Sequence, residues 1–129
     1  MKKFLACILS GAVFFCGCGS AGSRDEAGVY RKITPEEAKA IMDSRDPFIL
    51  LDVRTQSEFD GGHIEGAVLI PDTEIEDAAQ EKLPEKDALI LIYCRTGRRS
   101  ALAANALLGM GYTNVYDFGG IVVWPYGIV

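Results

Sequence analysis

Two apolar runs, residues 48–53 and 89–93, show no alternation between polar and apolar positions. A strand of this kind is buried on both faces, as in a parallel sheet that is covered by helices. Residues 29–33 could form a short strand, and residues 68–70 and 115–116 are weaker strand candidates. The pattern therefore predicts a sheet whose centre is formed by the two long apolar runs.

Helices are predicted between these strands. Thr34, Pro35 and Glu37 form a capping box with proline at the first helical position, so a helix is expected to begin there. Residues 73–80 and 100–108 also have helical patterns, and the second carries no charge beyond its start, which predicts that it is largely buried. Strands and helices alternate along the chain, which predicts an α/β fold with a mostly parallel central sheet flanked by helices on both faces.

The first residues differ in composition from the rest. Residues 1–17 contain 12 apolar residues and two charges, Lys2 and Lys3. The apolar run 4–15 is short for a membrane span and suits the central part of a signal peptide. A buried core helix or a short anchor is the alternative. We predict a signal peptide over 1–17 and one domain over 30–129.

Three of the four cysteines lie in this leader or directly after it, and Phe15-Cys16-Gly17-Cys18 resembles a bacterial lipoprotein box. Cys18 would then be acylated and become the new N-terminus, followed by a flexible tether over 18–29. Phe15 and Cys16 depart from the usual pattern, which has Leu at the first position and Ala or Ser at the second. Ordinary cleavage near Ala21 or Gly22 is the alternative. Both predict an exported protein, and the first predicts a lipid anchor in the cell envelope, facing the periplasm or the outer surface.

The composition restricts the function. The net charge is −5 over 129 residues, so the chain offers no general electrostatic attraction for nucleic acid. The domain holds one cysteine, Cys94, and one histidine, His63, which are too few for a zinc site or a dithiol redox pair. We expect no metal and no cofactor, and no sequence feature predicts an oligomeric state.

Cys94 lies at the end of a predicted buried strand and shortly before a predicted helix. Arg95, Arg98 and Arg99 follow it, and Gly97 allows a tight turn. Backbone N–H groups at a helix start and nearby guanidinium groups favour the thiolate, which is the nucleophilic form. The competing interpretation is a small buried hydrophobic residue at a strand end.

The other long strand ends at Asp52 and Arg54, at the same predicted sheet edge as Cys94. These two residues could orient the cysteine loop or bind substrate. The structural alternative is that Asp52 anchors backbone or pairs with a loop arginine, and that Arg54 pairs with Glu58 one helical turn further on.

Five short motifs in this order resemble a single-domain rhodanese, a sulfurtransferase, and the resemblance covers roughly residues 30–129. They are Leu51-Asp52-Val53-Arg54, Glu58-Phe59, His63-Ile64-Glu65-Gly66-Ala67, Cys94-Arg95-Thr96-Gly97-Arg98-Arg99-Ser100, and Gly119-Gly120 with Trp124. The resemblance implies that Cys94 accepts a sulfur from a small anionic donor such as thiosulfate and passes it from a persulfide to a thiol or cyanide. It also implies an anion-binding loop formed by Arg95, Thr96, Gly97, Arg98 and Arg99, and places His63 in a turn before a strand.

Two other function classes share this fold. Rhodanese-fold phosphatases and arsenate reductases use a longer loop, with an arginine after five residues, and here Ser100 stands at that position. A sulfur-carrier or binding module without catalysis would lack the nucleophile, which is present. Sulfur transfer is therefore the favoured interpretation, with phosphatase or arsenate chemistry and a carrier module as alternatives.

Overall fold

A computed structural model describes residues 30–129 of the chain. The predicted signal peptide, Cys18 and the predicted tether lie outside the described residues. None of the helices within 30–129 has both the length and the apolar character needed to cross a membrane.

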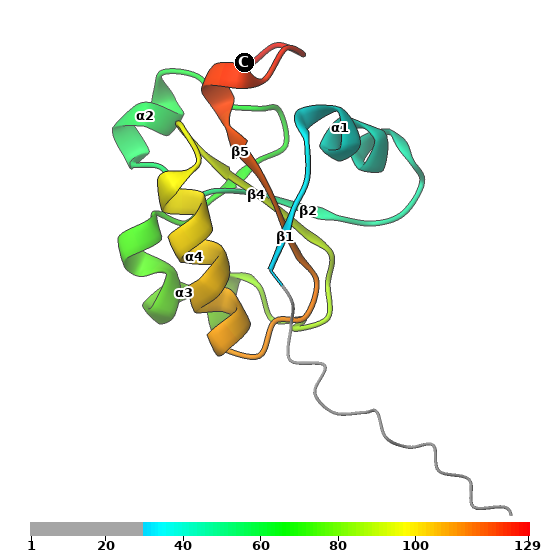
Figure 1. Cartoon of the computed structure of the whole chain (residues 1–129). Helices are drawn as coiled ribbons and strands as arrows, with labels where there is room; N and C mark the ends of the chain where they lie inside the picture. The colour runs from blue at the N-terminus through cyan, green and yellow to red at the C-terminus, as the bar shows by residue number, and fades with distance from the viewer. Residues whose placement is uncertain (1–29) are drawn as a thin grey trace, which may run out of the picture.

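The centre of the domain is one sheet of five parallel strands in the order β1-β5-β4-β2-β3 (Figure 1). The strands are β1 (Arg31–Lys32), β2 (Ile49–Asp52), β3 (Val68–Leu69), β4 (Ile90–Cys94) and β5 (Val115–Gly120). The two long apolar runs form β2 and β4, which pair with each other. This confirms the predicted α/β fold with a parallel sheet.

Helices cover both faces of this sheet (Figure 1). They are α1 (Pro35–Asp43), α2 (Gln56–Asp60), α3 (Ile75–Lys82) and α4 (Arg98–Gly109), with short 3-10 turns η2 (Asp72–Glu74) and η3 (Ile121–Val123). On one face α3 and α4 cover the buried side chains of a larger cluster, which include Leu51, Ile92, Ile75, Ala104 and Leu107. On the other face α1 covers a smaller cluster, which includes Leu50, Leu91, Tyr93, Ala38 and Phe118.

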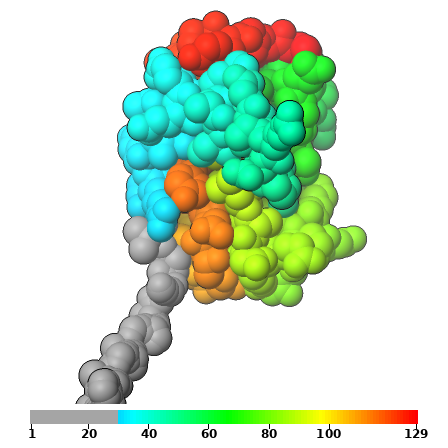
Figure 2. Space-filling view, turned by 90° about the vertical axis from the view of Figure 1, so that its right-hand side faces the viewer, coloured from blue at the N-terminus to red at the C-terminus, as the bar shows by residue number. Residues whose placement is uncertain are grey.

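The C-terminal residues lie across one end of the domain, next to α1 (Figure 2). The ammonium group of Lys39 on α1 lies 5.6 Å from the ring centre of Tyr126. Trp124 packs at an angle against Phe118, with ring centres 5.2 Å apart, and so connects this segment to the core under α1. The C-terminal segment therefore covers the same end of the sheet at which β2, β4 and β5 finish.

Two features of the helices differ from the sequence-based expectation. The helix α2 was not predicted, although Thr55 and Glu58 form the same capping box that begins α1 at Thr34. The helix α4 is less buried than predicted, because Leu102 is 58% exposed. A helix that packs one side on a sheet leaves its other side in solvent even when that side is apolar.

The loop after β4 lies directly on the end of β5. Cys94 pairs with Gly120 across the two strands, after an irregularity in the register beyond Ile92. A Cβ atom on Gly120 would overlap the carbonyl group of Arg95 and lie 2.7 Å from Cα of Thr96. Only glycine permits this close approach between the two backbones. The Gly119-Gly120 pair thus supports the loop that begins at Cys94.

We expect Gly120→Ala to lower the free energy of unfolding by about 1–3 kcal/mol, because the methyl group forces the loop away from β5. Urea denaturation measures this loss. Gly109→Ala is the matched control, since no atom lies within 4 Å of the added methyl group and the site is helical. Equal urea midpoints for the two variants would contradict the close approach.

Candidate active site

The sulfur of Cys94 lies at the end of β4 beneath the loop that leads into α4. Cys94 is 1% exposed. Gly97 has a φ of +109° and turns the loop back, so that its backbone N–H donates to the Cys94 Sγ at 3.0 Å. This is an amide donor at the start of a 12-residue helix, aimed at the sulfur. Such a donor stabilises negative charge on the sulfur.

A second polar group contacts the same sulfur. The Ser100 Oγ lies 3.6 Å from the Cys94 Sγ and accepts from the thiol. Ser100 in turn donates to Oδ1 of Asp117 at 2.8 Å. Ser100 and Asp117 are both buried, and neither was predicted from the sequence as a site residue. The only sequence signal for Asp117 was a charged residue inside an apolar strand.

The loop side chains point in different directions. Arg95, Thr96 and Arg98 are exposed, whereas Arg99 is partly buried and forms two hydrogen bonds with the Glu58 carboxylate, at 2.8 and 2.9 Å. The bond to Glu58 raises the pKa of Arg99, and negative charge on Cys94 contributes in the same direction. Within residues 30–129, the hydrogen bonds of the Cys94 sulfur are with Gly97 and Ser100, and none is with an arginine side chain.

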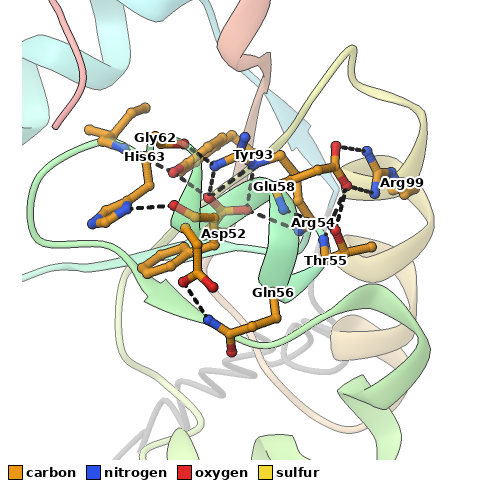
Figure 3. Close-up of polar contacts among 12 residues, drawn as sticks. Asp52, Arg54, Thr55, Gln56, Glu58, Gly62, His63, Tyr93 and Arg99 are labelled. Carbon is orange, nitrogen blue, oxygen red and sulfur yellow. Dashed lines mark hydrogen bonds and ion pairs between the residues drawn. The ribbon is translucent and has the colours of Figure 1, made fainter.

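Asp52 and Arg54 form a buried ion pair at the end of β2 (Figure 3). The Arg54 Nη2 donates to Asp52 Oδ2 at 2.7 Å and to the carbonyl of Gly62 at 2.8 Å. Tyr93 on β4 donates to the same carboxylate oxygen at 2.6 Å. Burial by itself lowers the pKa of Arg54. The hydrogen bond and the charge of Asp52 together raise this pKa by more, so the net shift is upward. Arg54 pairs with Asp52. The alternative pairing of Arg54 with Glu58 is wrong, because the Glu58 carboxylate forms its ion pair with Arg99.

His63 packs as a structural residue. Its ring stacks on Phe59 with centroids 3.8 Å apart, and its Nδ1 lies 3.0 Å from the Phe59 carbonyl oxygen. Its backbone pairs with Val129 through two hydrogen bonds of 2.9 and 2.8 Å. These contacts agree with the turn that the family resemblance implied for His63.

A cavity of about 410 Å³ lies beside the loop and is lined by residues that include Arg54, Arg95, Ile121 and Trp124. It combines two guanidinium groups and the carboxylate of Glu58 with an apolar wall. Cys94 lies below the loop and does not line this cavity. The described residues contain no group of three or more His, Cys, Asp or Glu side chains that could hold a metal ion.

Comparison with known proteins decides the family. Residues 34–125 match the rhodanese-like domain. The chain belongs to the rhodanese-like family.

Several relatives of this rhodanese-like chain are sulfurtransferases. It is 31% identical over 96 residues to the thiosulfate sulfurtransferase GlpE of Pseudomonas entomophila, covering 74% of this chain and 84% of that protein. It is 35% identical over 71 residues to the thiosulfate sulfurtransferase PspE of Escherichia coli, covering 55% and 68%. It is also 40% identical to MoeZ of Mycobacterium tuberculosis, a probable adenylyltransferase/sulfurtransferase, but covers 28% of that longer protein and 85% of this chain.

Solved structures give the same result for this rhodanese-like fold. A rhodanese from E. coli, solved with anions, is 31% identical with a TM-score of 0.61, covering 64% of this chain and 98% of that one. A rhodanese-like domain protein from Staphylococcus aureus is 32% identical with a TM-score of 0.67, covering 77% and 96%. The fold and the family are thus shown by both sequence and structure.

The ion pair between α2 and α4 predicts a pH dependence of stability. The bond to Arg99 lowers the pKa of Glu58 from 4.5 to about 2. The ion pair therefore stabilises the fold fully above pH 4.5, and this contribution is lost as the pH falls toward 2. Because the pair is partly exposed, we expect Glu58→Gln to lower the free energy of unfolding by about 1 kcal/mol at pH 7.

Urea denaturation at pH 7 and at pH 3 measures this contribution. The difference between the unsubstituted protein and Glu58→Gln should shrink at the lower pH. Glu81→Gln, at an exposed position on α3, serves as a control for the loss of one negative charge. A difference that stays constant between the two pH values would show that the ion pair does not stabilise the fold.

Proposed function

We propose that this protein is a sulfurtransferase that carries sulfur as a persulfide on Cys94. The observation that carries the proposal is the Gly97 N–H, which donates to the Cys94 Sγ at 3.0 Å. An amide that converges on a sulfur at a helix start favours the thiolate and therefore a nucleophile. The family of the chain and its thiosulfate sulfurtransferase relatives support the same chemistry.

The reaction proceeds in two transfers. In the first, the Cys94 thiolate attacks the outer sulfur of the donor, a new S–S bond forms, and the leaving group departs with the electron pair of the bond that breaks. With thiosulfate as the donor, the leaving group is sulfite. In the second, a thiolate or cyanide attacks the outer sulfur of the persulfide and restores the Cys94 thiolate.

The charges around the loop support a small anionic donor. Arg95 and Arg54 line the cavity beside the loop, and Arg98 and Arg99 follow at the start of α4. The E. coli rhodanese that this chain resembles was solved with anions. The loop residues Arg95 to Arg99 would hold the donor, whereas Asp52 and Arg54, which are bonded to each other, would support the cavity wall.

We expect Cys94→Ser to reduce thiosulfate:cyanide sulfurtransferase activity to the background rate, because a serine hydroxyl is not ionised at neutral pH and cannot form a persulfide. Release of thiocyanate measures the activity. Intact mass spectrometry after exposure to thiosulfate should show one added sulfur on the unsubstituted protein and none on the variant.

Circular dichroism and urea denaturation of Cys94→Ser control for loss of the fold. Full activity in a folded variant would contradict the persulfide mechanism. Hydrolysis of p-nitrophenyl phosphate, with no turnover of thiosulfate, would instead support the phosphatase alternative. The short loop, with Ser100 in place of an arginine, argues against that outcome.

We also propose that the protein is exported and anchored to a membrane through Cys18. The proposal rests on the basic start, the apolar run of residues 4–15 and the lipoprotein-like sequence that ends at Cys18. A domain attached in this way would act in the cell envelope.

We expect Cys18→Ala in the full chain to move the protein from the membrane fraction to the soluble fraction, because the acylated residue is lost. Cell fractionation followed by mass spectrometry of the N-terminal peptide measures both the location and the lipid. Cys7→Ala is the matched control and should stay in the membrane fraction. Membrane association that is unchanged by Cys18→Ala would contradict acylation at this residue.

A further inference from the structure

The mechanism above leaves one buried carboxylate without a role. Asp117 on β5 is 1% exposed and lies on the face of the sheet that α4 covers. Its Oδ1 accepts from the Gly119 N–H at 2.9 Å and from Ser100, and its Oδ2 accepts from the Tyr30 hydroxyl at 2.6 Å. Three donors stabilise a charged carboxylate here, and no Lys or Arg among residues 30–129 forms an ion pair with it.

Asp117 determines where the Ser100 hydroxyl proton points. The Ser100 Oγ has three possible acceptors: Asp117 Oδ1 at 2.8 Å, the Gly97 carbonyl at 3.2 Å and the Gly119 carbonyl at 3.4 Å. The carboxylate is the nearest and the only charged one, so it takes the proton. A lone pair of the Ser100 oxygen is then left to face the Cys94 thiol at 3.6 Å.

The groups around Cys94 and the groups around Asp117 have opposite effects on the charge of the sulfur. On the Cys94 side, the Gly97 N–H and the charge of Arg99 favour a thiolate. On the Asp117 side, burial and then the hydrogen bond to Asp117 raise the pKa of Tyr30 to about 12, so Tyr30 remains a neutral donor. Lys32 is aligned with Asp117 on β1 but its side chain is exposed.

We infer that Asp117 is a positioning residue for Cys94: through the Ser100 hydroxyl it holds the thiol proton in place and opposes negative charge on the sulfur. A second buried negative charge close to the first is unfavourable, and the hydroxyl that could donate to a thiolate is already directed at the carboxylate. This inference rests on the proposed function and adds a residue that sets the pH at which that function begins.

The step that Asp117 controls is the ionisation before sulfur transfer. The Cys94 thiol gives its proton to a base in the solvent, and its lone pair then forms the S–S bond to the donor. The sulfur–sulfur bond of thiosulfate breaks and sulfite leaves with the electron pair.

The test compares the alkylation rate of Cys94 as a function of pH in the full chain and in Asp117→Asn. Asparagine keeps the shape of aspartate and can still accept from Ser100, but it carries no charge. Iodoacetamide is the reagent, and mass spectrometry of the peptide that holds Cys94 separates it from the other cysteines. We expect the half-maximal pH to fall by about one unit in the variant, which is about tenfold faster alkylation at lower pH.

Two controls separate charge from packing. Asp87→Asn removes a negative charge at an exposed position before β4 and should leave the profile unchanged. Tyr30→Phe removes one hydrogen bond from the Asp117 network but keeps the charge, so its half-maximal pH should not fall. An unchanged or higher half-maximal pH in Asp117→Asn, or an equal fall in Tyr30→Phe, would overturn the inference.

A measurement on the unsubstituted protein covers the case in which Asp117→Asn does not fold. The ¹³C resonance of the Asp117 carboxyl group should shift at the pH at which the alkylation rate of Cys94 is half-maximal. The absence of that shift would overturn the inference. Sulfur loading from thiosulfate, followed by intact mass, should move with the alkylation profile. If alkylation shifts while no sulfur is added to either protein, the inference about Asp117 stands and the proposed sulfur transfer fails.

Discussion

The close contact between the loop after β4 and the glycines at the end of β5 determines where the reactive sulfur lies. Gly120 has no side chain, so the backbone of Arg95 and Thr96 can rest directly on it. Gly97 then turns back at a positive φ and brings its N–H to the Cys94 sulfur. The sulfur is positioned by backbone atoms, so the side chains of the three loop arginines are not needed to hold it.

Two buried carboxylates, Asp52 and Asp117, lie on different faces of the sheet near this loop. They differ in the groups that bond to them. Asp52 is neutralised by Arg54 and held by Tyr93, so it contributes a rigid ion pair to the cavity wall. Asp117 has only neutral donors among the described residues. The negative charge of Asp117 therefore still acts on Cys94. The negative charge of Asp52 is balanced by the positive charge of Arg54.

The sequence predicted those parts of the structure that depend on local pattern. The apolar runs that form β2 and β4, the capping box of α1 and the position of Cys94 at a strand end all follow from residues close together in the chain. The partner of Arg99 and the role of Asp117 do not, because each depends on side chains that are 41 or 17 residues apart. Helix α2 was missed although Thr55 and Glu58 carried a local signal.

The position of Arg99 shows how one long-range contact changes the chemistry of the site. The two bonds to Glu58 hold this guanidinium group of α4 against α2, so that it acts on Cys94 by charge rather than by contact. Its positive charge and the negative charge of Asp117 therefore act on the same sulfur in opposite directions. The link from Cys94 through Ser100 to a buried carboxylate distinguishes this site from a thiol surrounded by positive charge alone.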